Sequence, residues 1–318
     1  MTLLNESLAA CLPAPLRTLE PTFTRVTMGQ SGAAVYQVAA GAQAFVLKLA
    51  GAQEPPAEWR RKLQLQRIVA EAGLAPAVVH VDEERRSVLS VFVADRSFRT
   101  LYFDPSTRAT ALELMAHTLR RLHDLPLPPE AQSRDPREFL GTVWPAVSAG
   151  FPLPPFVGST VARMLAEEPP ACDRPPVLSH NDCNPSNLIY DGERLVLLDW
   201  DTAGPNDPYY DLATIALFLR MDEPTCRALL ALHDGVEETA LPARFRYDRR
   251  LVAVLCGTLF LHLARQSGRG GSTEAIEAVP ALGEVYQRLR AGALDLGSDE
   301  GRWQLGLALV KESVGLAT

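Results

Sequence analysis

The chain has 318 residues, of which 47% are hydrophobic and 22% charged, so it has enough apolar content for a sizeable core and for two lobes. Its formal net charge is -7, which argues against nucleic acid as the main partner because phosphate backbones attract basic surfaces. The five cysteines show no metal-ligand spacing, and no apolar run is long enough to cross a membrane. We therefore expect a cytoplasmic globular protein with no membrane or nucleic-acid partner.

A turn of small residues lies between two strand-like runs in residues 23–38. It contains Gly29, Ser31 and Gly32, whose backbone amides can approach phosphate oxygens because no large side chain intervenes. Taken alone, this spacing also fits an ordinary hairpin turn. Its place one strand before Lys48 favours a loop that covers a nucleotide.

Lys48 stands in an otherwise apolar predicted strand, residues 45–49. A strongly hydrated ammonium group in such a strand needs either an exposed face or an anionic partner. Because the small-residue turn precedes it, we expect Lys48 to contact phosphate. A solvent-facing lysine is the alternative.

Two further elements complete the first part of the chain. Pro55 and Pro56 open a predicted helix over residues 57–72, which has apolar positions at helical spacing. A β-rich run at residues 88–93 should then lead to a hinge between two lobes. Exposed backbone groups there, at Val91 and Val93, are expected to bond the edge of a nucleotide base.

Helices dominate the second part of the chain. The spacing of apolar residues predicts a helix over residues 109–125, near whose end His123 is expected to bond backbone or complement the helix dipole. Proline-dense stretches at 152–155 and 169–176 predict loops. Further helices are predicted from Asp207 to about Arg220 and at residues 229–233, 249–266, 275–291 and 302–314. The helix at 249–266 contains a long apolar run and should be buried.

Residues 177–213 carry the densest set of ionisable and amide oxygens. Short apolar runs at 188–190 and 195–198 flank a four-residue turn signal, which predicts a β-hairpin. An antiparallel pair would return Asp199 to the end of the sheet where Asn187 begins.

Asp182 precedes this hairpin in a loop that Pro185 interrupts, so it can reach the same end. Carboxylate and amide oxygens are hard donors, and their convergence suits a divalent cation such as Mg²⁺ bridging phosphates. Asp201 is a further candidate neighbour of the metal, although a solvated loop acid is the more common role for such a residue.

The order of these residues resembles a known catalytic arrangement. His180 to Asn187 reads H-x-D-x-x-x-x-N, with Asp199 one hairpin later, which resembles the catalytic loop and metal-binding aspartate of the protein-kinase-like fold. The stretches HNDCNPSNLI, LLDWDTAG and DPYYDLA resemble the aminoglycoside phosphotransferase and choline kinase family. A lone H-x-D would favour an ordinary acidic loop, but the joint pattern favours this family.

The resemblance implies a bilobal α+β protein-kinase-like fold, with a β-rich nucleotide-binding lobe at residues 1–93 and a mainly helical acceptor-binding lobe at 94–318. It also implies transfer of the γ-phosphoryl group of ATP or GTP to a hydroxyl of a small molecule. In that reaction Asp182 would orient the hydroxyl and accept its proton, while Asn187 and Asp199 would hold Mg²⁺. The remaining roles are phosphate neutralisation by Lys48, support of the loop by His180 and bracing from behind by Asp211.

One part of the family pattern is hard to place. In the family a helix glutamate pairs with the strand lysine, and Glu58 is the candidate here, with Glu71 as a weaker one. Glu58 lies in the first helical turn, where it equally suits the helix dipole. This departure keeps a nucleotide-binding regulatory pseudokinase open as an alternative, whereas a metal-dependent hydrolase is disfavoured because the histidines lack ligand spacing.

The acceptor is expected to be a hydroxylated molecule that carries a positive charge, because acids outnumber bases around the predicted site. Aminoglycosides, choline, ethanolamine, thiamine, homoserine-like compounds and sugar alcohols all stay open as acceptors. Aromatic residues of the helical part suit cation–π contact with such a substrate, although aromatics at helical spacing more often belong to a core. They are Tyr209, Tyr210, Phe260, Tyr286 and Trp303.

Overall fold

The computed structural model describes residues 3–26, 33–129, 131–133, 135–172 and 174–316. The chain packs as two compact units. The first comprises Met1–Leu122, Pro126–Ala131 and Pro185–Ala203, and the second comprises His123–Leu125, Gln132–Asn184 and Gly204–Thr318. The first unit continues past residue 93, where the boundary between the lobes was predicted. That boundary was drawn between a nucleotide-binding lobe and an acceptor-binding lobe, and this assignment of binding stays a prediction.

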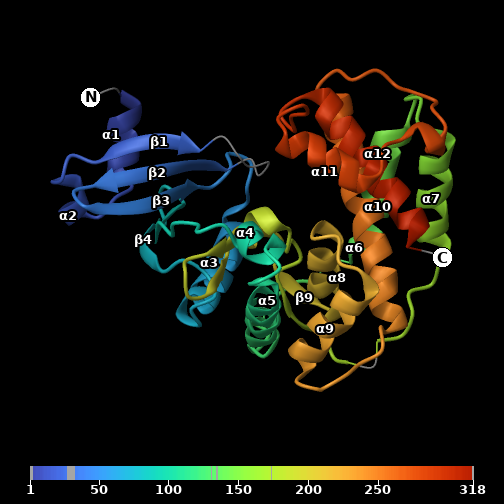
Figure 1. The fold of residues 1–318 in the computed structure, drawn as a ribbon. Coiled ribbons are helices and arrows are strands. Elements are labelled where there is room, and N and C mark those ends of the chain that lie inside the picture. The colour runs from blue at the N-terminus through green and yellow to red at the C-terminus, as the bar shows by residue number, and fades with distance from the viewer. Residues whose placement is uncertain (1–2, 27–32, 130, 134, 173, 317–318) are drawn as a thin grey trace. The chain divides into compact units, whose positions relative to one another are not determined.

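A five-stranded sheet forms the centre of the first unit (Figure 1). All neighbouring strands run antiparallel, and the order in space is β1-β2-β3-β5-β4. The strands predicted at residues 45–49 and 88–93 are confirmed as β3 and β5. The full set is β1 (Thr22–Val26), β2 (Ala34–Ala40), β3 (Gln43–Leu49), β4 (Val78–Asp82) and β5 (Ser87–Val91).

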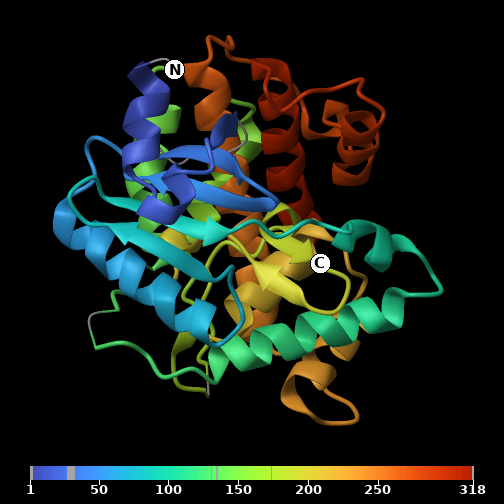
Figure 2. The ribbon, with the colours of Figure 1, turned by 90° about the vertical axis from the view of Figure 1, so that its left-hand side faces the viewer.

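Alternation along β3 and β5 sends neighbouring side chains to opposite faces of this sheet. Leu47 is paired with Leu89, and both are buried in a cluster with residues of helix α1 (Leu3–Ala10). The next pair, Lys48 and Val88, points the other way, where Val88 packs against helix α3 (Pro56–Glu71). The dark-blue and light-blue helices in Figure 2 lie on these two faces. Lys48 is therefore directed to the side that α3 covers.

The predicted hairpin is confirmed as strands β7 (Leu188–Tyr190) and β8 (Leu195–Leu197). It belongs to the first unit because its backbone bonds there: Leu197 N donates to Leu74 O at 2.8 Å, and Arg96 N donates to Tyr190 O at 2.7 Å. Its unit also contains α2 (Ala14–Arg17), α4 (Phe98–Phe103) and most of α5 (Arg108–His123).

The second unit is mainly helical. A short pair of antiparallel strands, β6 (Val177–Ser179) and β9 (Gly204–Asn206), flanks residues 180–203 in the chain. The helices are α6 (Pro136–Ser148), α7 (Pro155–Ala166), α8 (Tyr209–Phe218), α9 (Glu223–Asp234), α10 (Ala243–Gln266), α11 (Leu282–Arg290) and α12 (Asp299–Gly315).

Two helix expectations need correction. The continuous helix predicted over residues 275–291 is a 3₁₀ turn at Ile276–Ala278 followed by α11, because Pro280 disfavours helical backbone in the residue before it. Helices α6 and α7 lie in stretches where no helix was expected, although α7 begins at the end of the proline-dense stretch 152–155. Proline fits this place because its fixed φ suits the first helical turn.

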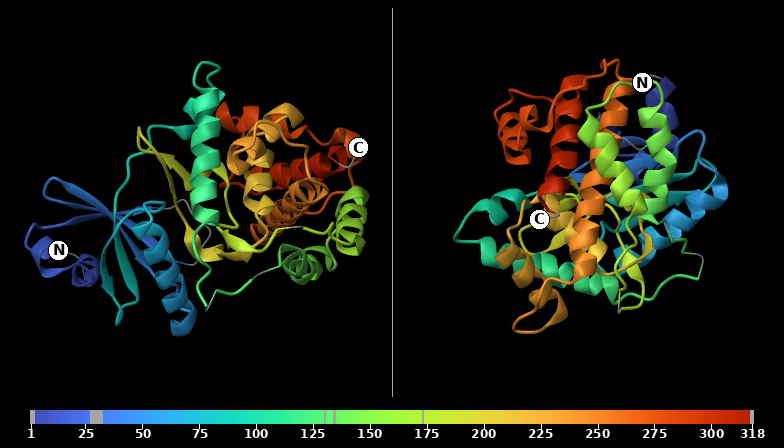
Figure 3. Two further views of the ribbon diagram at one scale, coloured as in Figure 1. Left: turned by 90° about the horizontal axis from the view of Figure 1, so that it is seen from below. Right: turned by 90° about the vertical axis from the view of Figure 1, so that its right-hand side faces the viewer.

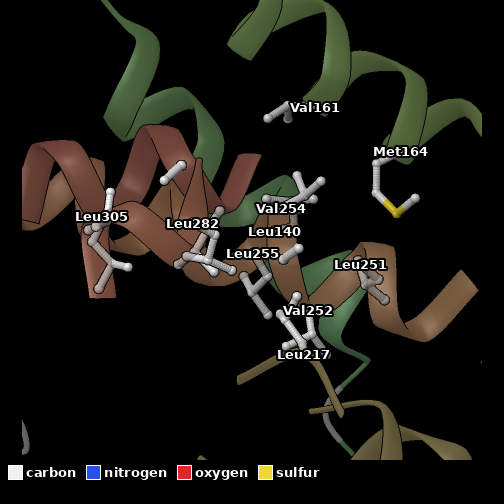
Figure 4. Packing of buried hydrophobic residues seen from close by; sticks show 14 of the residues in the cluster. Leu140, Val161, Met164, Leu217, Leu251, Val252, Val254, Leu255, Leu282 and Leu305 are labelled. Atoms are coloured by element: carbon white, nitrogen blue, oxygen red, sulfur yellow. The ribbon is translucent and has the colours of Figure 1, made fainter. Parts of the chain in front are cut away.

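Helix α10 is the centre of the second core (Figure 4). Its stretch from Leu251 to Leu255 is buried among residues of α6, α7, α8, α11 and α12, as expected for the apolar run in this region. Helices α6 and α7 also pack on α10 and α12 through a second cluster (Figure 3). At the α10–α12 crossing a Cβ on Gly257 would lie 2.8 Å from Gly306 O, so the backbones meet at a distance that a side chain would prevent.

Within the described residues, no helix combines the length and the apolar character that crossing a membrane requires.

Candidate functional site

The first unit brings one lysine and two aspartates together. Lys48 Nζ donates to Asp201 Oδ1 at 2.8 Å and to Asp199 Oδ1 at 3.3 Å. Both acids follow β8, at the 3₁₀ turn Trp200–Thr202, which contacts α3. The buried indole of Trp200 donates to Leu197 O at 3.0 Å and fixes this turn. The lysine thus comes from strand β3, and the two aspartates come from the turn that follows the β7–β8 hairpin.

The charges in this cluster stabilise one another. Burial alone would lower the pKa of Lys48, but the charges of Asp201 and Asp199 and their hydrogen bonds raise it above its ordinary value. The ammonium group is therefore charged at neutral pH. Asp199 also adopts a left-handed backbone conformation, with φ of 60°, which is uncommon outside glycine.

The oxygens of this cluster suit a divalent cation. Two carboxylates that hold one ammonium group present their oxygens to a common cation position, and their side chains are 39% and 27% exposed for Asp199 and Asp201. Asn187 lies beside them in the hairpin, since its carbonyl accepts a bond from Leu198 N at 2.8 Å. Carboxylate and amide oxygens fit Mg²⁺. No group of three His, Cys, Asp or Glu side chains with metal-site geometry occurs among the described residues, so further ligands would come from phosphate and water.

The second unit fixes the segment that contains Asp182. Buried Asp211, on α8, accepts hydrogen bonds from His180 N and Asn181 N, both at 2.8 Å. Asn181 has a left-handed φ of 63°, so the chain turns sharply immediately before Asp182. Asn184 Nδ2 donates to Asp182 Oδ1 at 2.9 Å. The backbone that carries Asp182 is therefore held by an acid lying behind it.

Asp211 is ionised in this setting. Burial opposes its charge, but the hydrogen bond and charge of His123, with further help from His180, lower the pKa of Asp211 to about 2. His123 Nε2 lies 3.3 Å from Asp211 Oδ2. His123 ends α5, as its expected role at the helix dipole requires, but its contact with a buried carboxylate distant in sequence was not predicted.

Several residues that were predicted to bind the nucleotide do not take part in the contacts described so far. Gly29, Ser31 and Gly32 fall outside the described residues. The predicted Lys48–Glu58 pair does not form, because Glu58 lies 3.5 Å from Lys62 and 3.9 Å from Arg61 on its own helix. The two acids after β8 pair with Lys48 instead.

The hinge candidates also differ from each other. Val91 ends β5 and donates its backbone N–H to Ala77 O at 2.9 Å, so that group is already used. Val93 follows the strand, and its N–H makes no hydrogen bond within the part of the chain that the structure describes. Val93 is therefore the better placed of the two to bond a ligand through its amide.

The structure adds a buried acid that sequence reasoning missed. Asp248 of α10 is fully buried beside Asp207 and Arg244, and burial, with the Asp207 charge, raises the pKa of Asp248 well above its usual range. Asp207 Oδ1 accepts from Tyr209 N, the first residue of α8, at 2.8 Å. The sequence could have indicated this ion pair, because Arg244 and Asp248 are four residues apart on a helix and so lie on the same face.

The aromatic residues proposed as cation contacts belong mostly to the core. Tyr209, Tyr210 and Trp303 are no more than 5% exposed. Arginines of the chain itself lie over two of these rings, Arg174 at 5.0 Å from the Tyr209 centroid and Arg269 at 5.2 Å from that of Trp303. Phe260 and Tyr286 are only partly buried.

Comparisons with known proteins agree with this fold. The sequence profile described as phosphotransferase enzyme family matches residues 22–248, more than half of the chain. Protein LicA of Haemophilus influenzae is 47% identical over 36 residues, a match that spans 11% of this chain and 14% of LicA.

Solved structures are similar over nearly the whole chain. A choline/ethanolamine kinase family protein from Mesorhizobium loti is 18% identical, with 99% of each chain covered and a TM-score of 0.59. The choline kinase LicA from Streptococcus pneumoniae is 14% identical, with 98% of each chain covered and a TM-score of 0.61. A LicA structure in complex with AMP is equally similar. These likenesses confirm the predicted α+β protein-kinase-like fold, and the profile match shows that the chain belongs to the phosphotransferase enzyme family.

Proposed function

We propose that the chain transfers the γ-phosphoryl group of ATP or GTP to a hydroxyl of a small molecule. The observation that carries the proposal is the convergence of Asp199 and Asp201 on Lys48. A lysine held by two partly exposed carboxylates provides positive charge for phosphates and oxygen ligands for a cation. The AMP complex of a structurally similar LicA supports nucleotide as the donor.

In this proposal the residues of the first unit bind the donor. Lys48 contacts the nucleotide phosphates, releasing its carboxylate partners as phosphate oxygens replace them. Asn187 and Asp199 would hold Mg²⁺, with Asp201 as a neighbour, and the ion when bound would neutralise charge on the phosphates. Nucleotide binding therefore exchanges the partners of Lys48, since phosphate oxygens take the place of the two carboxylates.

Asp182 serves the acceptor. Its carboxylate orients the acceptor hydroxyl and accepts its proton as the oxygen forms a bond to the γ-phosphorus; the bond from that phosphorus to the bridging oxygen breaks, and the nucleoside diphosphate leaves. Asp211 and His180 act on this step only by fixing the backbone before Asp182. The fixed geometry contributes because phosphoryl transfer depends mainly on positioning and charge.

A cationic hydroxylated acceptor suits the surroundings of Asp182. Burial, together with the Asp182 charge, raises the pKa of Cys256 on α10 to about 12, so an uncharged thiol rather than a thiolate lies near that carboxylate. The partly buried Phe260 follows one helical turn later. The names of the similar choline and ethanolamine kinases agree with an amino alcohol.

The test is acceptor-stimulated release of nucleoside diphosphate from ATP and from GTP. The panel contains choline, ethanolamine, aminoglycosides, thiamine, homoserine-like compounds and neutral sugar alcohols, each with Mg²⁺ and with a chelator. We expect stimulation by cationic acceptors that requires Mg²⁺ and weakens as salt screens the charges. Turnover of neutral sugars alone would remove the charge part of the proposal and leave phosphotransfer intact.

The regulatory pseudokinase remains the second candidate because Glu58 pairs with Arg61 and Lys62 rather than with Lys48. It predicts nucleotide binding without turnover of any acceptor. The same panel, combined with a direct measurement of nucleotide affinity, separates the two candidates.

A further inference from the structure

A buried chain of polar groups extends from Asp211 to the surface of the second unit. His123 Nδ1 lies 3.0 Å from His233 Nε2, and His233 Nδ1 lies 2.8 Å from Asp234 Oδ1. Arg174 then binds Asp234 with two hydrogen bonds, of 2.7 and 2.6 Å. His123 and His233 are 9% and 6% exposed, whereas the Arg174 side chain is 35% exposed.

The hydrogen bonds of this chain require a proton that two neutral imidazoles do not have. Three contacts join Asp211, His123, His233 and Asp234, and each needs one proton. An ionised carboxylate only accepts hydrogen bonds, and a neutral imidazole carries one N–H. Two neutral rings supply two protons for three contacts, so one ring must be doubly protonated for all three to form.

The surroundings favour this extra proton. His123 is the last residue of α5 and His233 lies in the last turn of α9, so the negative ends of two helix dipoles meet the pair. The charged or titratable neighbours come from four segments: Asp211 on α8, Asp234 on α9, Arg174 before β6 and His180 after it. Cys183 also lies near Asp211.

The distribution of charge assigns the doubly protonated ring. Burial first, and then the neighbouring His123 and Arg174, lower the pKa of His233 despite its bond to Asp234. Burial also opposes the charge of Asp234, but hydrogen bonds from Arg174 and His233 hold the pKa of Asp234 below its ordinary value. Asp234 already pairs with the Arg174 guanidinium through two hydrogen bonds, whereas Asp211 is fully buried against His123. This geometry favours the extra proton on His123, with His233 donating to Asp234 and accepting from His123.

We propose that His233 and Asp234, anchored by Arg174, are positioning residues that keep His123 doubly protonated and thereby hold Asp211 against the backbone of residues 180 and 181. Loss of the shared proton as pH rises, or loss of the relay by substitution, breaks one of the three contacts. The segment before Asp182 then loses part of its support. The role in turnover rests on the proposed phosphotransfer, whereas the protonation state does not.

The first test is direct observation of the rings. Long-range ¹H–¹⁵N spectra of histidine-labelled protein through a pH titration should show one imidazole with both nitrogens protonated at neutral pH. In His233→Leu the acceptor for His123 Nδ1 is gone, so the doubly protonated state should be lost at a pH lower by about one unit or more, the size of one hydrogen bond to a charged group. His117→Leu, an exposed position on the same helix as His123, is the matched control and should leave these signals unchanged.

The second test is the pH dependence of turnover. Asp234→Asn keeps the volume of the side chain and removes its charge, so it remains informative if His233→Leu does not fold. We expect an alkaline loss of kcat at the pH where the imidazolium signal disappears, shifted to lower pH in Asp234→Asn, with kcat reduced on the order of tenfold above that pH and KM for nucleotide unchanged.

Two results would overturn the relay: both rings singly protonated in the unmodified protein at neutral pH, or identical ring signals and pH profiles in His233→Leu and Asp234→Asn. A protein that shows the imidazolium but turns over no acceptor would instead refute the proposed phosphotransfer and leave the relay standing.

Discussion

The two acidic clusters of this chain differ in how their carboxylates are satisfied. Asp199 and Asp201 are partly exposed and share a single lysine, whereas Asp211 is fully buried and binds two backbone amides and a histidine. A partly exposed ion pair is worth little and exchanges partners easily, while breaking a buried one is costly. The comparison teaches that the first cluster is suited to ligand exchange and the second to holding backbone in place.

The largest expected effect is on stability, in Asp211→Ala. This variant leaves His123 and the amides of residues 180 and 181 buried without their acceptor, so we expect a loss of roughly 3–5 kcal/mol in the free energy of unfolding. Chemical denaturation at neutral pH measures it, with Asp201→Ala in the exposed cluster as the control. A loss no greater than that of the control would erase the distinction between the clusters.

The acid stability of the unmodified protein checks the same residue. The pKa of Asp211 is depressed to about 2 from an ordinary 3.8, so its contribution is fully present above pH 3.8 and is lost as pH falls towards 2. Asp211→Ala should therefore unfold with a shallower acid dependence in that window. An unchanged slope would contradict the assigned ionisation.

The next effect is catalytic, in Asp182→Asn. The change removes a proton acceptor with little change of volume, and we expect turnover to fall roughly 10²-fold or more while nucleotide affinity stays the same. The exposed Asp104→Asn serves as control. Near-normal turnover in Asp182→Asn would remove the proposed general base.

Asp199→Ala should act on binding rather than on stability. The nucleotide–Mg²⁺ complex loses a charged ligand, and a loss of affinity of about ten- to a hundredfold follows from about 1.5–3 kcal/mol for a charge-assisted interaction. Magnesium titrations of nucleotide binding measure the effect. Asp191→Ala, in the turn at the far end of the same hairpin, should leave affinity unchanged, and equal affinity in both variants would argue against a metal ligand at Asp199.

The smallest effect is expected for Asp201→Asn. Its ion pair with Lys48 is about one-third exposed, so we expect a change below about 1 kcal/mol in the free energy of unfolding. Thermal denaturation without nucleotide measures it. A change as large as that of Asp211→Ala would mean that the exposed cluster is structural as well.

Local pattern was enough for much of the fold. Alternating apolar residues and turn chemistry predicted strands β3, β5, β7 and β8, and helical spacing predicted α3, α5 and the core helix α10, because these signals lie within short stretches of chain. The same reasoning missed α6, α7 and the break before α11, where proline positions decide between helix and loop.

The sequence by itself determined the candidate chemistry, because H-x-D-x-x-x-x-N and the following aspartate fix residue types at a spacing that a loop and a hairpin can use. Only the tertiary structure decided the partners. Lys48 binds Asp199 and Asp201, 151 and 153 residues away, and not the nearer Glu58. His123 meets His233 across 110 residues. Such pairs arise from which faces of strands and helices pack together, and no local periodicity encodes the choice of partner across that distance.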